Sequence, residues 1–113
     1  MPALSLNGVI LIPHLTIAGT FHARAEGLLG KSGLEPGYGL LIRPCSSIHT
    51  LFMRFPIDVI FLDSQNRVVR IVRNLPPWRM ARGGWKAQTV VEVQSGWLPA
   101  IQTGGKLEIR ATP

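Results

Sequence analysis

The sequence predicts a mainly β protein with some α+β tendency: a compact antiparallel β-barrel or sandwich that carries one or two short helices. The composition is that of a packed globule, since 46% of the residues are hydrophobic and only 16% are charged. The 12 glycines and 9 prolines in 113 residues require frequent turns, which favours many short strands over a helical bundle. A chain of this length fits a single domain, residues 1–113, with one core of its own.

The first half of the chain contains two predicted strands and a third extended segment. Residues 8–12 form the first strand, and Pro13 restricts it to an edge or a strand end because proline has no amide hydrogen to donate. Tyr38–Ile42 forms the second strand and ends before Pro44. Residues 48–52 are expected to be extended as well.

The middle of the chain predicts a β-hairpin. Ile57–Leu62 and Val68–Leu75 are apolar runs on either side of residues 63–67, whose sequence Asp-Ser-Gln-Asn-Arg has the polar chemistry of a turn. Apolar side chains occupy both faces of the two runs at their centres. We therefore expect both strands in the middle of a sheet that is covered on both sides.

Two more strands and two helices complete the prediction. Thr89–Gln94 alternates in a way that indicates a strand with one face wetter than the other, and residues 106–110 alternate strictly, as in a terminal strand with one solvent face. A helix is expected over residues 21–29, with Thr20 as its cap, and a short helical turn over residues 97–102.

The single cysteine and the apolar runs indicate the compartment. One cysteine excludes an intrachain disulfide, and a lone thiol suits a reducing environment. No apolar run reaches the roughly 20 residues of a membrane helix, and the N-terminal run is cut by Pro13 before it matches a signal peptide. The sequence therefore predicts a cytoplasmic protein that does not enter a membrane.

The formal net charge of +6 is concentrated in one part of the chain. Residues 67–86 carry six arginines and lysines and no acidic residue. Such a run could bind a phosphate, a nucleic acid or an acidic protein, or it could be a solvated face that aids solubility. No RNA-binding, zinc-finger or helix-turn-helix pattern accompanies it.

Residues 44–58 gather chemically versatile side chains just ahead of an apolar strand. Cys45, His49 and Met53 are four residues apart and share a face in either an extended or a helical backbone. In a cysteine-dependent enzyme, Cys45 would be the nucleophile, His49 its base and Asp58 the group that orients the histidine. The alternative is that Cys45 is a small apolar side chain of the core, the common position of a free cysteine.

The same thiol, imidazole and thioether would suit a soft metal ion such as Cu(I). On an extended strand, however, ligands four residues apart lie about 13 Å from each other, since each residue rises about 3.3 Å. A helix would bring them closer, but Phe55-Pro56 interrupts a helix there. The sequence therefore predicts neither a metal site nor a cofactor.

Asp58 stands at the start of the apolar strand Ile57–Leu62, where a carboxylate without partners would be costly. We expect it to be mostly buried and to contact Arg54, Arg79 or nearby backbone amides. Two roles are open for it. Asp58 can hold a loop through backbone amides, or it can line a pocket with Arg54, whose guanidinium would bind a small carboxylate or phosphate through two hydrogen bonds.

The favoured function is that of a non-catalytic accessory protein that binds a small anionic ligand or a protein partner. Its polar and aromatic face would come from residues 44–58 and 76–86, because tryptophans beside arginines often mark binding surfaces. The alternative for each indole is to cover an open end of the barrel. The residues expected to line the face are His49, Met53, Arg54, Asp58, Trp78 and Arg79. Either a monomer or a weak dimer is consistent with the sequence.

Several short motifs occur in an order that resembles the domain of unknown function 192 (DUF192) family. They are residues 25–30 (AEGLLG), 39–42 (GLLI), 53–58 (MRFPID), 61–63 (FLD) and 104–107 (GGKL). Many members have Trp-Met-Lys-Asn-Thr followed by Pro-Leu-Asp, whereas here Met53-Arg54 leads directly into residues 55–58, so any role of the missing Trp and Asn does not transfer. The resemblance implies a mainly β domain without a settled activity.

Overall fold

The computed structural model describes residues 2–18, 35–51 and 53–111, and all regular structure in these ranges is β-strand. The mainly β class is confirmed, and the helix predicted over residues 21–29 lies outside the described residues. The strands are β1 (Ala3–Leu6), β2 (Val9–Ile12), β3 (His14–Ala18), β4 (Tyr38–Ile42), β5 (Ser47–His49), β6 (Ile57–Leu62), β7 (Val68–Leu75), β8 (Met80–Arg82), β9 (Thr89–Gln94) and β10 (Leu107–Arg110).

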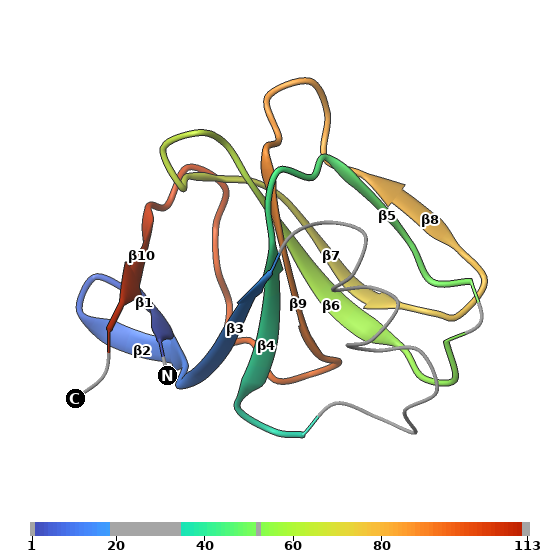
Figure 1. Ribbon diagram of the computed structural model, residues 1–113, viewed down its shortest axis with the longest axis horizontal. Helices are drawn as coiled ribbons and strands as arrows, with labels where there is room; N and C mark the ends of the chain where they lie inside the picture. The colour runs from blue at the N-terminus through green and yellow to red at the C-terminus, as the bar shows by residue number, and fades with distance from the viewer. Residues whose placement is uncertain (1, 19–34, 52, 112–113) are drawn as a thin grey trace.

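These strands form three sheets (Figure 1). The central sheet has five strands in the order β3-β4-β9-β6-β7, in which β3 and β4 are parallel and every other pair is antiparallel. A three-stranded sheet has the order β10-β1-β2, and β5 pairs with β8 in a two-stranded ribbon. Within the described residues the central sheet stays open, with β3 and β7 at its edges, so a closed barrel is not formed.

Both faces of the central sheet are covered. All six residues of β6 are buried, and alternate side chains point to opposite faces. Val59 and Phe61 pack in one apolar cluster with Ile48 and Ala81 of the β5–β8 ribbon. The second cluster, on the opposite face, joins Ile60 and Leu62 of β6 to Leu4 and Leu107 of the three-stranded sheet, among others. The ribbon and the three-stranded sheet are therefore the covers of a central layer.

The predicted β6–β7 hairpin is confirmed, but the position of one of its strands is not. β6 lies between β9 and β7, whereas β7 is the edge strand of the central sheet. Arg70, Arg73 and Asn74 are exposed on it. The apolar centre of β7 packs on only part of its surface, so the expectation that both strands lie in the middle of the sheet was wrong for β7.

The prediction of a wetter face for β9 was also wrong. β9 lies between β4 and β6, and its first five residues are buried. Glu92 is only 1% exposed and pairs in register with Leu40 of β4 and Val59 of β6. The alternating pattern predicts a solvent-facing position for this polar residue, but its partners in register are apolar residues of the two neighbouring strands.

Two N-terminal strands were not predicted. β1 is joined to β2 by Asn7 and Gly8, which have φ values of 51° and 81° and form the two-residue turn of a hairpin. β3 follows Pro13, where the chain passes from the three-stranded sheet to the central one. Both strands bring buried residues to the core, including Leu4 and Leu15.

The remaining local expectations were partly met. Residues 8–12 contain strand β2, which lies at a sheet edge as the following proline allows, and residues 106–110 contain β10 with its exposed Glu108. Of the segment expected to be extended at 48–52, residues 48–49 belong to β5, residues 50–51 are not strand, and residue 52 lies outside the described residues. Residues 97–102 form no helix: Pro99 disfavours a helical conformation of the residue before it, and the side chain of Arg73 donates to the carbonyls of both Leu98 and Pro99.

Candidate functional site

Three chain segments meet at one end of the central sheet, which we call the loop end. It consists of residues 43–47 after β4, the β6–β7 turn at residues 63–67, and residues 82–89 from the end of β8 to the start of β9. The strand registers bring these segments together, because β4 and β6 end where β7 and β9 begin. They lie at the top of the molecule in Figure 1.

Backbone hydrogen bonds join these segments. The amide of Cys45 donates to the carbonyl of Gln88 (2.9 Å), and the amide of Gly83 donates to the carbonyl of Ser46 (2.9 Å). The amide of Gln88 donates in turn to the carbonyl of Leu62 at the end of β6 (2.8 Å). The loop end is therefore tied both across its own segments and to the central sheet.

The base of the β8–β9 connection depends on Gly83. A Cβ atom added to this glycine would collide with the ring of Phe61 and with the side chain of Ala87. Gly84 instead has a φ of 93° and open space around it, so its role is to turn the backbone. The two glycines thus seat the connection on the core and direct the next residue, Trp85, into solvent.

Two open depressions indent the loop end. The first, which we call the Arg43 depression, has a volume of about 190 Å³ and is lined by Arg43, Pro44, Ser64, Asn66, Gln88 and Thr89. The second, the Trp85 depression, has a volume of about 470 Å³ and is lined by Ser46, Ser47, Arg82, Gly84 and Trp85. Each takes part of its lining from the segment after β4 and part from the segment before β9, so the depressions are neighbours.

The loop end is basic. Its segments contain four cationic side chains, namely Arg43, Arg67, Arg82 and Lys86, and one carboxylate, Asp63. Lys106 is added from the chain before β10, since it forms an isolated β-bridge with Arg67. The surplus of positive charge gives this end an attraction for anions.

The carboxylate of Asp63 accepts hydrogen bonds within the β6–β7 turn. Its Oδ1 accepts hydrogen bonds from the amides of Arg67 and Gln65, both at 2.9 Å. The hydrogen bond from the Arg67 amide lowers the pKa of the Asp63 carboxyl below its ordinary value. Burial opposes this effect, but the hydrogen bond from Gln65 and the charges of Arg67 and Lys86 add to it, so the net shift is downward. The one acidic group of the loop end is thus held by the turn.

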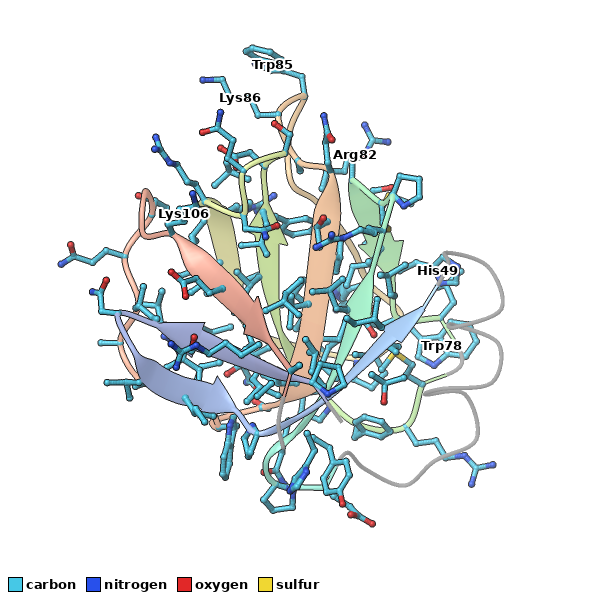
Figure 2. All side chains as sticks on the ribbon, turned by 60° about the vertical axis from the view of Figure 1, so that its left-hand side comes forward. His49, Trp78, Arg82, Trp85, Lys86 and Lys106 are labelled. Atoms are coloured by element: carbon cyan, nitrogen blue, oxygen red, sulfur yellow. The ribbon has the colours of Figure 1, made fainter. Side chains whose placement is uncertain are left out.

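Trp85 is the most exposed aromatic residue of the loop end, with 90% of its surface open to solvent. The ammonium of Lys86 lies 5.2 Å from the centre of the indole, in a cation–π contact. Figure 2 shows Trp85, Lys86 and Arg82 together at this end, while His49 and Trp78 lie further along the ribbon. An exposed indole beside cations is suited to binding rather than to the core.

The other end of the ribbon is fixed by Thr50, which the sequence did not single out. Its buried hydroxyl donates to the carbonyl of Pro76 (2.6 Å) and accepts from the amide of Arg79 (2.9 Å). Its carbonyl accepts from the amide of Trp78 (2.9 Å), a residue with a φ of 64°. Trp78 and Arg79, two of the predicted site residues, are both exposed and are placed by these bonds.

The structure separates the other predicted site residues. His49 is exposed on β5, opposite Met80 of β8, and Arg54 is exposed on the chain that follows the ribbon. Met53 is 6% exposed and belongs to the apolar cluster beneath the ribbon. None of the six predicted residues lines either depression of the loop end.

Asp58 is buried, as predicted, at the opposite end of the central sheet. Its Oδ1 accepts from the amide of Asn74 (2.7 Å) and its Oδ2 from the amide of Gly96 (3.0 Å). Asn74 has a φ of 54° and lies where the β6–β7 register shifts, so the carboxylate holds a β-bulge. The arginine beside it is Arg73, at 3.8 Å, rather than Arg54 or Arg79.

The thiol of Cys45 makes its hydrogen bond within its own loop. Its thiol donates to the carbonyl of Ser47 (3.1 Å), and its side chain packs against the apolar cluster beneath the ribbon. These contacts favour the apolar alternative for this residue, because its one S–H donor is not directed at an imidazole. In the part of the chain that the structure describes, no three His, Cys, Asp or Glu side chains gather as a metal site would require.

Trp97 is a structural residue. Its Nε1 donates to the carbonyl of Leu11 (2.8 Å), and so it occupies a hydrogen-bond acceptor of the edge strand β2. The sequence offered covering an open end of a barrel as the alternative to a binding role for each tryptophan, but no closed barrel is formed within the described residues, and Trp97 instead bonds to an edge strand.

The fold and the loop end together define a small β protein with a basic end that carries an exposed tryptophan. The chain belongs to the DUF192 family, described as "Uncharacterized ACR, COG1430", which matches residues 5–109 and confirms the resemblance found in the motifs. A UPF0127 protein of Pyrococcus horikoshii is 39% identical over 92 residues, covering 76% of each chain. One from Pyrococcus furiosus is 42% identical over 99 residues, covering 80% of this chain and 82% of its own.

Two crystal structures share the fold. A protein of unknown function from Novosphingobium aromaticivorans has a TM-score of 0.74 and 21% identity over 95% of this chain and 82% of its own. A putative transcription regulator from Sinorhizobium meliloti has a TM-score of 0.76 and 17% identity over 96% of this chain and 91% of its own. At these identities the comparison establishes the fold alone.

Replacing Asp58 with Ala is expected to lower the free energy of unfolding by about 1–3 kcal/mol, because two backbone amides would lose the acceptor that this buried carboxylate provides. Urea unfolding monitored by circular dichroism measures this. Glu108→Ala is the matched control, since that carboxylate is exposed and should change stability by less than about 0.5 kcal/mol. Equal stability of the Asp58 variant and the wild type would show that the carboxylate does not hold the bulge.

Asp63 should make the stability of the turn depend on pH. Its pKa is lower in the folded than in the unfolded state, so its stabilising effect is present above the unfolded value of about 3.9 and is lost as pH falls through the folded value. Asp63→Ala should therefore melt below the wild type at pH 7, and the gap should narrow as the pH is lowered to 2. A gap that is the same at both pH values would contradict the assigned hydrogen bonds.

Proposed function

We propose that this protein is a non-catalytic binding module that recognises an anionic partner at its loop end. The observation that carries the proposal is the open Trp85 depression, which combines the guanidinium of Arg82, two hydroxyls and an exposed indole. Guanidinium and hydroxyl groups donate hydrogen bonds to anions, and the indole adds a flat apolar surface. Of the two segments predicted from the sequence, 44–58 and 76–86, the proposed face takes residues 44–47 and 82–86, and it adds the β6–β7 turn.

The basic run at residues 67–86 does not act as one surface in this proposal. Arg73 lies near Asp58 and donates to two carbonyls after β9, at the far end of the sheet. Arg70 donates to the carbonyl of Arg82 and supports the ribbon. The cations left for a partner at the loop end are those of Arg43, Arg67, Arg82, Lys86 and Lys106.

The compartment and assembly are part of the same proposal. The single cysteine suits the reducing cytoplasm, and the module would act as a single domain, as a monomer or a weak dimer. The described residues contain no helix long and apolar enough to cross a membrane.

Fluorescein-labelled heparin, a sulfated polyanion, is a suitable general probe. The double variant R82A/K86A should bind it about tenfold more weakly than the wild type, because two loop-end cations are lost. The matched control is R54A/R110A, which removes the same charge from exposed residues outside the loop end and should weaken binding less than twofold. Fluorescence anisotropy at fixed ionic strength gives both affinities.

Equal losses in the two double variants would show that only net charge matters and would overturn the proposal, as would an absence of heparin binding by the wild type. Cys45→Ser should bind as the wild type does. Reproducible turnover of a small ester, thiol or phosphate substrate that disappears in Cys45→Ser would instead support the cysteine-dependent enzyme and contradict a purely binding role.

A further inference from the structure

We propose that the anionic partner is a single-stranded nucleic acid, bound with a phosphate in the Arg43 depression and a base stacked on Trp85. The inference rests on the proposed function and identifies its partner class. It depends on the two neighbouring depressions of the loop end, which differ in chemistry.

The Arg43 depression has the donors of an oxyanion site. Its lining residues carry a guanidinium, two hydroxyls and two side-chain amides, from Arg43, Ser64, Thr89, Asn66 and Gln88, and no carboxylate. The guanidinium has five N–H donors, and one nitrogen is held by the Asn66 Oδ1 at 3.4 Å, which leaves other donors for a ligand. A tetrahedral phosphate with several acceptor oxygens matches this set.

The β6–β7 turn beside this depression is held by hydrogen bonds. Asn66 has a φ of 62°, and the amides of the turn bind the Asp63 carboxylate. The acidic group nearest to the depression is thereby directed to backbone donors, and Arg67 and Lys86 flank it with positive charge. A phosphate would thus meet more positive than negative charge.

The Trp85 depression has the features of a stacking platform. Every base has a π-face, so an exposed indole can bind single-stranded nucleic acid with little sequence preference. Trp85 is 90% exposed at the tip of a connection whose base is packed on Phe61. Arg82 lines the same depression, and Lys86 lies over the indole, so cations are available to a neighbouring phosphate.

The two depressions lie within reach of one short stretch of strand. Pro44 lines the first and Ser46 the second, and two residues of chain span at most about 7 Å. The hydrogen bond from the Cys45 amide to the Gln88 carbonyl and that from the Gly83 amide to the Ser46 carbonyl join the segments that line them. A phosphate and a base of one short stretch of strand can therefore reach both places, whereas duplex DNA keeps its base faces stacked inside.

The test compares labelled (dT)12 with an abasic 12-mer that has the same sugar–phosphate backbone. The wild type should bind (dT)12 about tenfold more tightly, since stacking of a base on an aromatic side chain is lost in the abasic strand. Trp85→Ala should remove this preference, because only the indole distinguishes the two strands. Trp85→Ala should also melt at the wild-type temperature, since the side chain is almost fully exposed.

Arg43→Gln should weaken (dT)12 and the abasic strand by the same factor and reduce the slope of log K against log salt by about one, as expected for the loss of one phosphate contact. Arg43→Lys should restore part of the affinity, and Arg54→Gln is the control with the same loss of charge. A loss in Arg54→Gln equal to that in Arg43→Gln would overturn the phosphate assignment.

The remaining outcomes separate this inference from the proposed function. Equal binding of (dT)12 and the abasic strand would overturn the inference and leave a general anion site. If neither strand binds while heparin still does, the inference also fails and the proposed function stands. Binding to phosphatidylglycerol vesicles, or to a decaglutamate peptide, in preference to (dT)12 would assign the loop end to a lipid surface or an acidic protein and would likewise overturn the inference.

Discussion

The burial of the central sheet on both faces is the constraint on which the rest of the structure depends. β6 and β9 are almost entirely inaccessible, so each face of the sheet needs an apolar cover. The three-stranded sheet supplies one cover and the β5–β8 ribbon the other. Because the ribbon is held over the sheet by buried side chains such as Ile48 and Ala81, the loops that connect it to β4 and β9 must pass the end of the sheet together. The loop end is a consequence of that packing.

Polar side chains hold the central sheet and the ribbon together at the ends away from the loop end. Asp58 accepts hydrogen bonds from the amides of a β-bulge and of the turn after β9 and so supplies both with an acceptor. Thr50 does the same for the ribbon, through one hydroxyl shared between Pro76 and Arg79. These side chains serve the fold, which explains why chemically capable residues of segment 44–58 do not converge on a single site. The groups that do converge come from three connections distant in sequence.

The sequence was sufficient for elements whose signals are local. The β6–β7 hairpin has long apolar runs around a polar turn, and both of its strands were predicted with the bounds that the structure shows. Strand β1 also has a local signal, since Asn7-Gly8 is a typical two-residue hairpin turn. By contrast, the burial of Glu92 and the edge position of β7 depend on strand order. Strand order is set by long-range packing, and residue patterns within one strand do not encode it.

The candidate site was predicted in part for the same reason. The exposed tryptophans and the two glycines before Trp85 are visible in the sequence, and they led to the segment 76–86. That Arg43, Ser64 and Gln88 line one depression is not visible in the sequence. These residues belong to three separate connections, which only the strand registers bring together. Without those registers, sequence proximity favoured His49 and Asp58, which lie on different parts of the molecule.

Mapping of amide chemical shifts during titration with a heparin tetrasaccharide tests the central claim most directly, because it locates a bound anion without any substitution. The account predicts that the shifted amides belong to residues 43–47, 63–67 and 82–89, at one end of the central sheet. Shifts confined to the opposite end, around Asp58 and Gly96, or an absence of shifts at any concentration, would contradict it.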